Sequence, residues 1–449
     1  MRVWLKDPMA IFGATEIGEP VGGLVLADGF VTEVLAPGAM PAQATDEVID
    51  ASRHVVLPGL INTHHHFYQT MTRAHPAAIN CELFDWLRAL YPIWARLTPE
   101  AHALASRLAM AELLLSGVTT ASDHHYLFPA GLDEAIDIQI AEARAIGLRF
   151  TATRGSMSLS TRDGGLPPPH VVQTHDAILA DSERLITRYH DPSPGAQIQI
   201  ALAPCSPFSV TPELMRDSAD LAQRHDCRLH THLAETHDET DFCLALFGRR
   251  PLDHLEDLGW LGPQTWLAHG IHFAPEEIAR LGTAGVGIAH CPTSNMTLAS
   301  GQCRTLELEA AGCALGLGVD GSASNDASNM LDDVRHALLL NRLTYGAARM
   351  THLDALRWAT QGGARCLGRD DIGHLRPGAA ADLAMLRLDQ EPRFSGAHNP
   401  LAAAVLCGAN RADRVMVGGR WRVWDGELVD LDLAELRDQH HTEAMRLFA

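Results

Sequence analysis

The sequence has no run of about 18 consecutive apolar residues, the length that a helix needs to cross a bilayer. Its opening, MRVWLKDPMA, lacks the apolar core of a secretory signal peptide. The nine cysteines include no C-x-x-C pair, and an odd, scattered set is typical of a reduced intracellular protein rather than a disulfide framework. These absences predict a cytoplasmic protein without membrane association.

Basic residues are scarce as well. The chain has 35 lysines and arginines against 55 acidic residues, a net charge of −20, and the basic residues form no cluster. This field would repel a phosphate backbone, so we expect no nucleic-acid partner. The apolar fraction of 46% and the charged fraction of 20% are ordinary for a globular protein. A chain of 449 residues is long enough for one large barrel and a smaller second domain.

Strand-like and helical patterns alternate along most of the chain. Short apolar or β-branched runs occur at 54–64, 117–123, 148–154, 198–204, 228–233, 265–270, 285–291 and 314–320. A helical stretch follows each run, which predicts the α/β class and a closed (β/α)8 TIM barrel. A doubly wound open sheet is the alternative. It would require a glycine-rich phosphate turn after the first strand, and the sequence has none there.

The two ends of the chain have a different character. Residues 1–57 and 375–449 contain short alternating strands with Asp-Gly or Gly-Gly turn signals. We expect these ends to form one small β-sandwich, with a C-terminal helix inside the second segment. Residues 58–374 are expected to form the barrel.

Several histidines stand at the predicted strand ends. His64 and His66 close the first strand, and their spacing places both side chains on one face. His232 closes the fifth strand, and Glu235 follows it by three residues. His230 lies on the same face as His232 but two residues deeper, so we expect it to pack behind the ligands. Each feature alone has an ordinary structural explanation, such as a solvated strand end or a histidine near a helix cap.

Two further strand ends add to this set. His269 closes the sixth strand in LAHG, and Asp320 closes the eighth in GVDG. A lone strand-end histidine is usually structural and a lone Asp-Gly is usually a turn. In a barrel, however, the carboxyl ends of the strands meet at one catalytic face. Three imidazoles and a carboxylate there suit Zn²⁺ or another borderline divalent ion, which lowers the pKa of a bound water from about 15.7 toward 7. Glu235 is free to move protons, so the pattern predicts a metal-dependent hydrolase.

The segments PGLINTHHH, HTHLAET, LAHG, HCPTSN and GLGVDGSASND together resemble the amidohydrolase superfamily. Within it they are most similar to the branch of guanine, S-adenosylhomocysteine and triazine deaminases and chlorohydrolases, and the resemblance covers nearly the whole chain. It implies one metal ion with four ligands: His64, His66, His232 and Asp320. Zinc is the expected ion and iron the alternative. The resemblance also implies a homo-oligomer.

The same resemblance implies roles for the neighbouring residues. His269 is expected to contact the attacking water or the substrate, together with Asp320, and Glu235 is expected to be the proton shuttle. The fourth strand ends in APCSP without a lysine, so a second metal bridged by a carboxylated lysine is not expected.

The segments THHHFYQTMTR and ASDHHYLFP look most like bacterial 8-oxoguanine deaminases and the related hydroxytriazine aminohydrolases. The implied substrate is a small heterocycle, first 8-oxoguanine and then guanine or isocytosine. Four residues are candidates to bind it: Gln69, Trp86, Tyr126 and Cys205. An amide such as Gln69 can donate to and accept from a lactam edge, and the two aromatic rings can stack on a planar base. Packing within loops would explain each of them equally well.

Three alternatives stay open on the sequence. A hydroxytriazine aminohydrolase or chlorohydrolase would share nearly all of these residues. A deaminase of S-adenosylhomocysteine or methylthioadenosine would need arginines for the ribose and carboxylate, and Arg73, Arg88 and Arg154 are candidates. A non-catalytic scaffold of the same fold is the non-enzyme alternative, but all four ligands and Glu235 are present.

Overall fold

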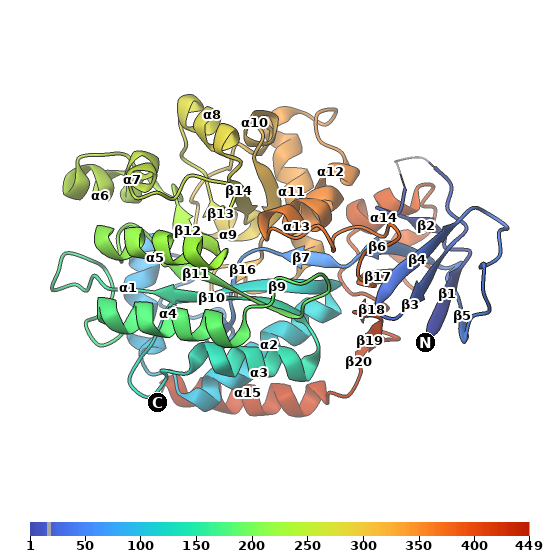
Figure 1. The fold of residues 1–449 in the computed structure, drawn as a ribbon, viewed down its shortest axis with the longest axis horizontal. Coiled ribbons are helices and arrows are strands. Elements are labelled where there is room, and N and C mark those ends of the chain that lie inside the picture. Colours follow the sequence, from blue (N-terminus) through green and yellow to red (C-terminus); the bar gives the residue numbers. More distant parts are fainter. Residues whose placement is uncertain (16–18, 449) are drawn as a thin grey trace.

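The computed structural model describes residues 1–15 and 19–448. Eight parallel strands close into a barrel in the order β10-β11-β12-β13-β14-β15-β7-β9 (Figure 1). Their bounds are β7 Leu60–Asn62, β9 Val118–His125, β10 Arg149–Ser156, β11 Ile198–Pro204, β12 Arg228–Leu233, β13 Thr265–His269, β14 Gly287–His290 and β15 Ala314–Leu317. The predicted (β/α)8 barrel is therefore confirmed. Nearly all of these strand residues are buried, as expected for parallel strands covered by helices.

Helices follow the strands and surround the barrel (Figure 1). The outer layer includes α2 Pro99–Leu115, α3 Ala135–Ile146, α4 His175–Tyr189, α5 Pro212–His225, α8 Pro275–Ala284, α10 Thr305–Ala311 and α12 His352–Arg357. Helix α5 illustrates the local signals: the Thr211 side chain accepts from Leu214 N, a proline opens the first turn, and Asp226 ends the helix in a left-handed conformation. Such caps set where each helix starts and so where the preceding strand-end loop must finish.

The first barrel strand differs from its prediction. The run 54–64 is not one strand but two: β6 (His54–Pro58) belongs to an outer sheet, and β7 enters the barrel. Gly59 lies between the two strands, and its N–H donates to the Asp382 carbonyl. A larger residue does not fit there, because a Cβ would lie 2.0 Å from Thr119 Oγ1. Two residues separate β7 from β8 (His65–His66), which pairs with β16 (Asp320–Gly321). That short pairing joins the first and last strand ends of the barrel.

Two sheets lie beside the barrel and are built from both ends of the chain (Figure 1). One has the order β4-β3-β1-β5 and the other β2-β6-β17-β18-β19-β20. The strands are β1 Arg2–Lys6, β2 Ala10–Ile11, β3 Gly23–Ala27, β4 Phe30–Leu35, β5 Glu47–Asp50, β17 Leu383–Arg387, β18 Arg414–Val417, β19 Arg420–Trp424 and β20 Glu427–Leu428. Leu5, Leu24, Val56 and Met416 share one buried apolar cluster, so the sheets pack face to face.

The last helix, α15 (Leu433–Phe448), leaves these sheets and packs on the barrel against α2 and the short helix η1 (Phe67–Thr72). His440 Nε2 lies 2.9 Å from Thr70 Oγ1, which ties this helix to the segment that follows the first barrel strand. Among the described residues, no helix combines the length and apolar character that a membrane span requires.

Candidate active site

The predicted metal ligands come together at the carboxyl ends of the barrel strands. The ligand nitrogens of His64, His66 and His232 all lie within 4.8 Å of one another, and so do the ligand atoms of His64, His269 and Asp320. Asp320 Oδ1 is 3.3 Å from His64 Nε2 and 3.2 Å from His66 Nε2. His66 Nε2 is 3.2 Å from His232 Nε2. All of these side chains are buried.

Backbone carbonyls fix the tautomers of two of these histidines. His66 Nδ1 lies 2.8 Å from the His124 carbonyl, and His232 Nδ1 lies 2.7 Å from the Cys205 carbonyl. A carbonyl can only accept, so each Nδ1 carries the proton and donates it. Each Nε2 then presents its lone pair to the centre of the cluster, the arrangement that a metal ligand needs.

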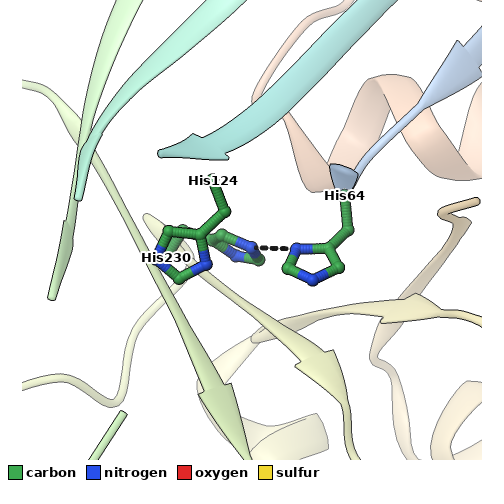
Figure 2. A group of neighbouring side chains, drawn as sticks. All are labelled: His64, His124 and His230. Carbon is green, nitrogen blue, oxygen red and sulfur yellow. Dashed lines mark hydrogen bonds between the residues drawn. The ribbon is translucent and has the colours of Figure 1, made fainter. Parts of the chain in front are cut away.

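A second histidine fixes the tautomer of His64 (Figure 2). His230 Nδ1 donates to the Trp266 carbonyl at 2.9 Å, so its Nε2 is free to accept from His64 Nδ1 at 2.8 Å. The Nε2 of His64 is therefore unprotonated, and it has no hydrogen-bond partner among the described atoms. Burial lowers the pKa of His64 to about 4, which keeps the ring neutral. The strand spacing indicated this position for His230, behind the predicted ligands.

The carboxylate completes the set. Burial opposes ionisation of Asp320, but the close imidazole rings of His64 and His66 hold its pKa well below the ordinary value. Its Oδ2 accepts from Ser294 Oγ at 2.6 Å. Three imidazole lone pairs and one ionised carboxylate thus converge in a buried space, and this donor set fits a borderline divalent ion.

Glu235 and His269 stand next to this cluster. His269 Nε2 is 3.5 Å from Glu235 Oε2 and 4.0 Å from Asp320 Oδ2. Its Nδ1 donates to Asn295 Oδ1 at 3.0 Å, so its Nε2 is the nitrogen that faces the two acids. Burial raises the pKa of Glu235, while the nearby His269 opposes that rise. A carboxyl group with a raised pKa holds a proton more readily, so it can act as a proton donor as well as an acceptor.

A small cavity opens onto these residues. It is lined by His66, Gln69, Leu83, Trp86, Leu87, Tyr91, Tyr126, Cys205, Phe208, His232, Glu235, His269, Leu298, Asp320 and Ser324. All four predicted substrate-binding residues are therefore in its wall. Apart from these four and the predicted metal and proton-transfer residues, the lining is apolar or aromatic except for Ser324, as is typical of a small-molecule site.

The Ala323 backbone holds two of these side chains in place. Gln69 Oε1 accepts from Ala323 N at 3.3 Å, and Trp86 Nε1 donates to Ala323 O at 3.1 Å. The amide nitrogen of Gln69 is thereby left as the donor side of this residue. Tyr126 meets the His66 ring edge-on, with 5.3 Å between ring centroids. Burial raises the pKa of the Cys205 thiol to about 12, so this cysteine is a neutral wall residue rather than a nucleophile.

Comparison with known proteins agrees with this geometry. A model of the amidohydrolase family matches residues 55–422. The chain belongs to the amidohydrolase family. It is 63% identical over 448 residues to an 8-oxoguanine deaminase of Pseudomonas aeruginosa, with 100% of this chain and 99% of the relative covered. It is 39% identical over 413 residues to a hydroxydechloroatrazine ethylaminohydrolase of Pseudomonas sp. (strain ADP), covering 90% and 85% of the two chains.

Solved structures extend the comparison. The crystal structure of an atrazine chlorohydrolase from Arthrobacter aurescens TC1, complexed with zinc, superposes with a TM-score of 0.93 at 32% identity and covers 100% of both chains. The family expected from the sequence motifs is thus confirmed, and the buried histidine and aspartate cluster of this amidohydrolase is compatible with a metal site.

The three arginines considered for a nucleoside substrate are engaged elsewhere. Arg73 pairs with Glu112. Arg88 pairs with Asp85 on the exposed side of α1 (Leu83–Trp94). Arg154 pairs with Asp181 at 2.6 Å. None of the three lines the cavity, and the described lining contains no lysine or arginine.

Sequence reasoning missed several residues of this amidohydrolase site. Tyr91, Phe208 and Leu298 line the cavity but come from helices and loops that carry no strand-end signal. Ser294 and Asn295, which support Asp320 and His269, lie in the HCPTSN segment. The sequence shows this segment as a family motif, but only the three-dimensional contacts show that the Ser294 hydroxyl donates to Asp320 and that the Asn295 amide oxygen accepts from His269.

Proposed function

We propose that this chain is a metal-dependent hydrolytic deaminase of an amino-substituted oxopurine, with 8-oxoguanine as the substrate and urate and ammonia as the products. The 63% identity to an 8-oxoguanine deaminase along essentially the whole chain carries the substrate assignment. In chemical terms the enzyme is a hydrolase that acts on a carbon–nitrogen bond of a cyclic amidine.

Four residues of this chain would hold the ion: His64, His66, His232 and Asp320. We propose one zinc ion, because the donor set suits zinc and a zinc-complexed structural neighbour shares the fold. A divalent ion in this site supplies a water molecule of lowered pKa and a Lewis-acid centre. The residues of the chain then orient the reactants and move the protons.

Asp320 and His269 orient the attacking water and take up its proton, since both face the same space. Glu235 takes one of the two water protons and gives it to the ring nitrogen beside the carbon under attack. The second proton, taken up by Asp320 and His269, passes to the departing amine. The ring carbon gains a carbonyl oxygen, the ring nitrogen gains a proton, and ammonia leaves. The raised pKa of Glu235 supports this shuttle role.

The lining of the cavity suits a substrate with a flat, uncharged ring. Trp86 and Tyr126 offer aromatic surface, and the Gln69 amide can donate to a ring carbonyl because its oxygen is already held by Ala323 N. A substrate with a carboxylate would find no lysine or arginine partner in the described lining. These features favour an oxopurine over S-adenosylhomocysteine.

An ammonia-release screen with zinc-loaded protein tests the proposal. The substrates are 8-oxoguanine, guanine, isocytosine, a hydroxytriazine and adenosine. We expect the largest kcat/KM for 8-oxoguanine, with urate formed in equal amount to ammonia. Faster turnover of the hydroxytriazine would reassign the chain to the triazine branch, and turnover of adenosine alone would overturn the oxopurine assignment.

A further inference from the structure

We propose that Glu239 is a positioning residue that sets the place of the proton shuttle Glu235, an inference that rests on the proposed function. Glu239 lies in the first turn of α6 (His237–Phe247), four residues after the shuttle. Its Oε1 accepts from Ala234 N and its Oε2 from Glu235 N, each at 3.0 Å. One carboxylate thus holds the two consecutive amides that lead into the shuttle.

This arrangement is not an ordinary helix cap. Thr236 is the N-cap residue of α6, and a capping box would direct the third helical residue, Glu239, to the Thr236 amide. Glu239 instead reaches past the cap to the two amides before it. The carboxylate therefore stabilises the loop that carries Glu235 rather than the start of the helix.

The peptide group between Ala234 and Glu235 is also held at its carbonyl oxygen. The Ala234 carbonyl accepts from Ile271 N and His272 N, both at 2.9 Å. Ala234 has a φ of 54°, in the left-handed region that a non-glycine residue adopts only when its surroundings enforce it. The chain turns here between the end of β12 and α6, so these hydrogen bonds fix the direction in which Glu235 leaves the strand.

Glu239 has no other visible role. It is completely buried, and no described lysine, arginine or histidine forms an ion pair with it. Burial raises the pKa of Glu239 to about 8, and the hydrogen bonds from Ala234 N and Glu235 N oppose that rise. Glu277 and Asp382 are buried carboxylates that also accept backbone N–H groups, and each has an arginine partner, Arg250 and Arg149. Asp123 and Asp333, which accept from Phe67 N and Thr293 N, resemble Glu239 in having no arginine partner among the described residues. A buried acid whose partners are two amides next to the shuttle has the geometry of a positioning group.

The test compares Glu239→Gln with Glu235→Gln and the double variant. Glutamine has the same shape but keeps only one acceptor oxygen, so one of the two amides loses its partner. We expect kcat for 8-oxoguanine to fall by about 10- to 100-fold, because a small displacement of a catalytic group has effects of this size, while KM and metal content stay unchanged. In the Glu235→Gln background the second substitution should cost nothing more.

Amide hydrogen exchange gives a readout that does not depend on turnover. In Glu239→Gln the amides of Ala234 and Glu235 should exchange faster, with the rest of the chain unchanged. Asp382→Asn is the control: it alters a buried carboxylate that accepts from Gly418 N at 2.7 Å, and it should lower the melting temperature without changing kcat or this exchange. If Glu239→Gln does not fold, Glu239→Asp, which is shorter by one methylene, is measured in its place.

Two results would overturn the inference: unchanged kcat and unchanged exchange in Glu239→Gln, or an equal further loss of activity in the Glu235→Gln background. Wild-type protein that releases no ammonia from 8-oxoguanine would contradict the proposed function instead. In that case, amide exchange at Ala234 and Glu235 would still test whether Glu239 holds these two amides.

Discussion

His230 Nε2 lies 2.8 Å from His64 Nδ1, and this contact decides which nitrogen of His64 faces the metal cluster. The bond continues from His230 Nδ1 to the Trp266 carbonyl, so the proton positions are set by a backbone group that cannot donate. Replacing His230 by Phe keeps a ring of similar size but removes the acceptor. We expect metal affinity to fall about 10- to 100-fold, a typical cost of losing such a supporting contact.

Titration with a competing chelator measures this loss. The control is His254→Phe, which alters another buried imidazole, on α7 (Pro251–Asp257), that stacks on Phe247. It should leave metal affinity unchanged. Equal affinities for the His230→Phe variant and the wild type would mean that His64 is oriented by other contacts.

Glu235→Gln separates proton transfer from metal binding. Glutamine cannot take up and release a proton as a carboxyl group does, so we expect the rate of ammonia release to fall by about 10²- to 10⁴-fold, the range for general acid–base catalysis. Metal content should stay at the wild-type level. His232→Ala should instead lose both metal and turnover. Metal content measured beside activity distinguishes the two, and loss of metal from Glu235→Gln would place this residue among the ligands.

Gly321→Ala is expected to act through Gln69. A Cβ at Gly321 would lie 1.8 Å from Gln69 Oε1, so the amide must leave Ala323 N. Moving the Gln69 amide removes its hydrogen bond to the substrate, which is worth about 0.5–1.5 kcal/mol, so we expect kcat/KM for 8-oxoguanine to fall by about 2- to 13-fold. Gln69→Leu should have a similar effect, and the double variant little more. Full additivity of the two losses would show that Gly321 acts independently of Gln69.

Stability is expected to decline in mild acid because of His102. Burial lowers the pKa of this ring from 6.5 to about 4. Above pH 6.5 the ring is neutral in both the folded and unfolded states, so its contribution to stability is complete. As the pH falls from 6.5 toward 4, only the unfolded chain takes up the proton, and the free energy of unfolding decreases.

Between pH 6.5 and 5 this single group removes about 2 kcal/mol. Urea unfolding at pH 7 and pH 5 measures the effect. His102→Leu should show a pH dependence smaller by about that amount, since the titrating group is gone. An unchanged dependence would mean that His102 titrates normally in the folded protein.

The barrel and the ligand cluster could be predicted from the sequence because both depend on local pattern. Alternating strands and helices define the barrel, and the carboxyl ends of its strands must meet, which brought His64, His232 and Asp320 together. The division of residues 54–64 into two strands could not be predicted. It depends on the approach of Thr119 and Asp382 to Gly59, two contacts distant in sequence.

The supporting residues were harder to predict for the same reason. His230 lies on the ligand face of its strand, so its position behind the site followed from the period of two, but its partner His64 comes from another strand. Glu239 looks like a helix-cap residue in the sequence. Only the turn at Ala234 shows that its carboxylate holds the shuttle loop.

Anomalous diffraction at the zinc absorption edge, from crystals of zinc-loaded protein, tests the central claim most directly. The account predicts one strong peak per chain, bounded by His64, His66, His232 and Asp320 and adjacent to Glu235 and His269. A peak instead among His64, His124 and His230, the neighbouring cluster in Figure 2, or no peak at full zinc loading, would contradict it.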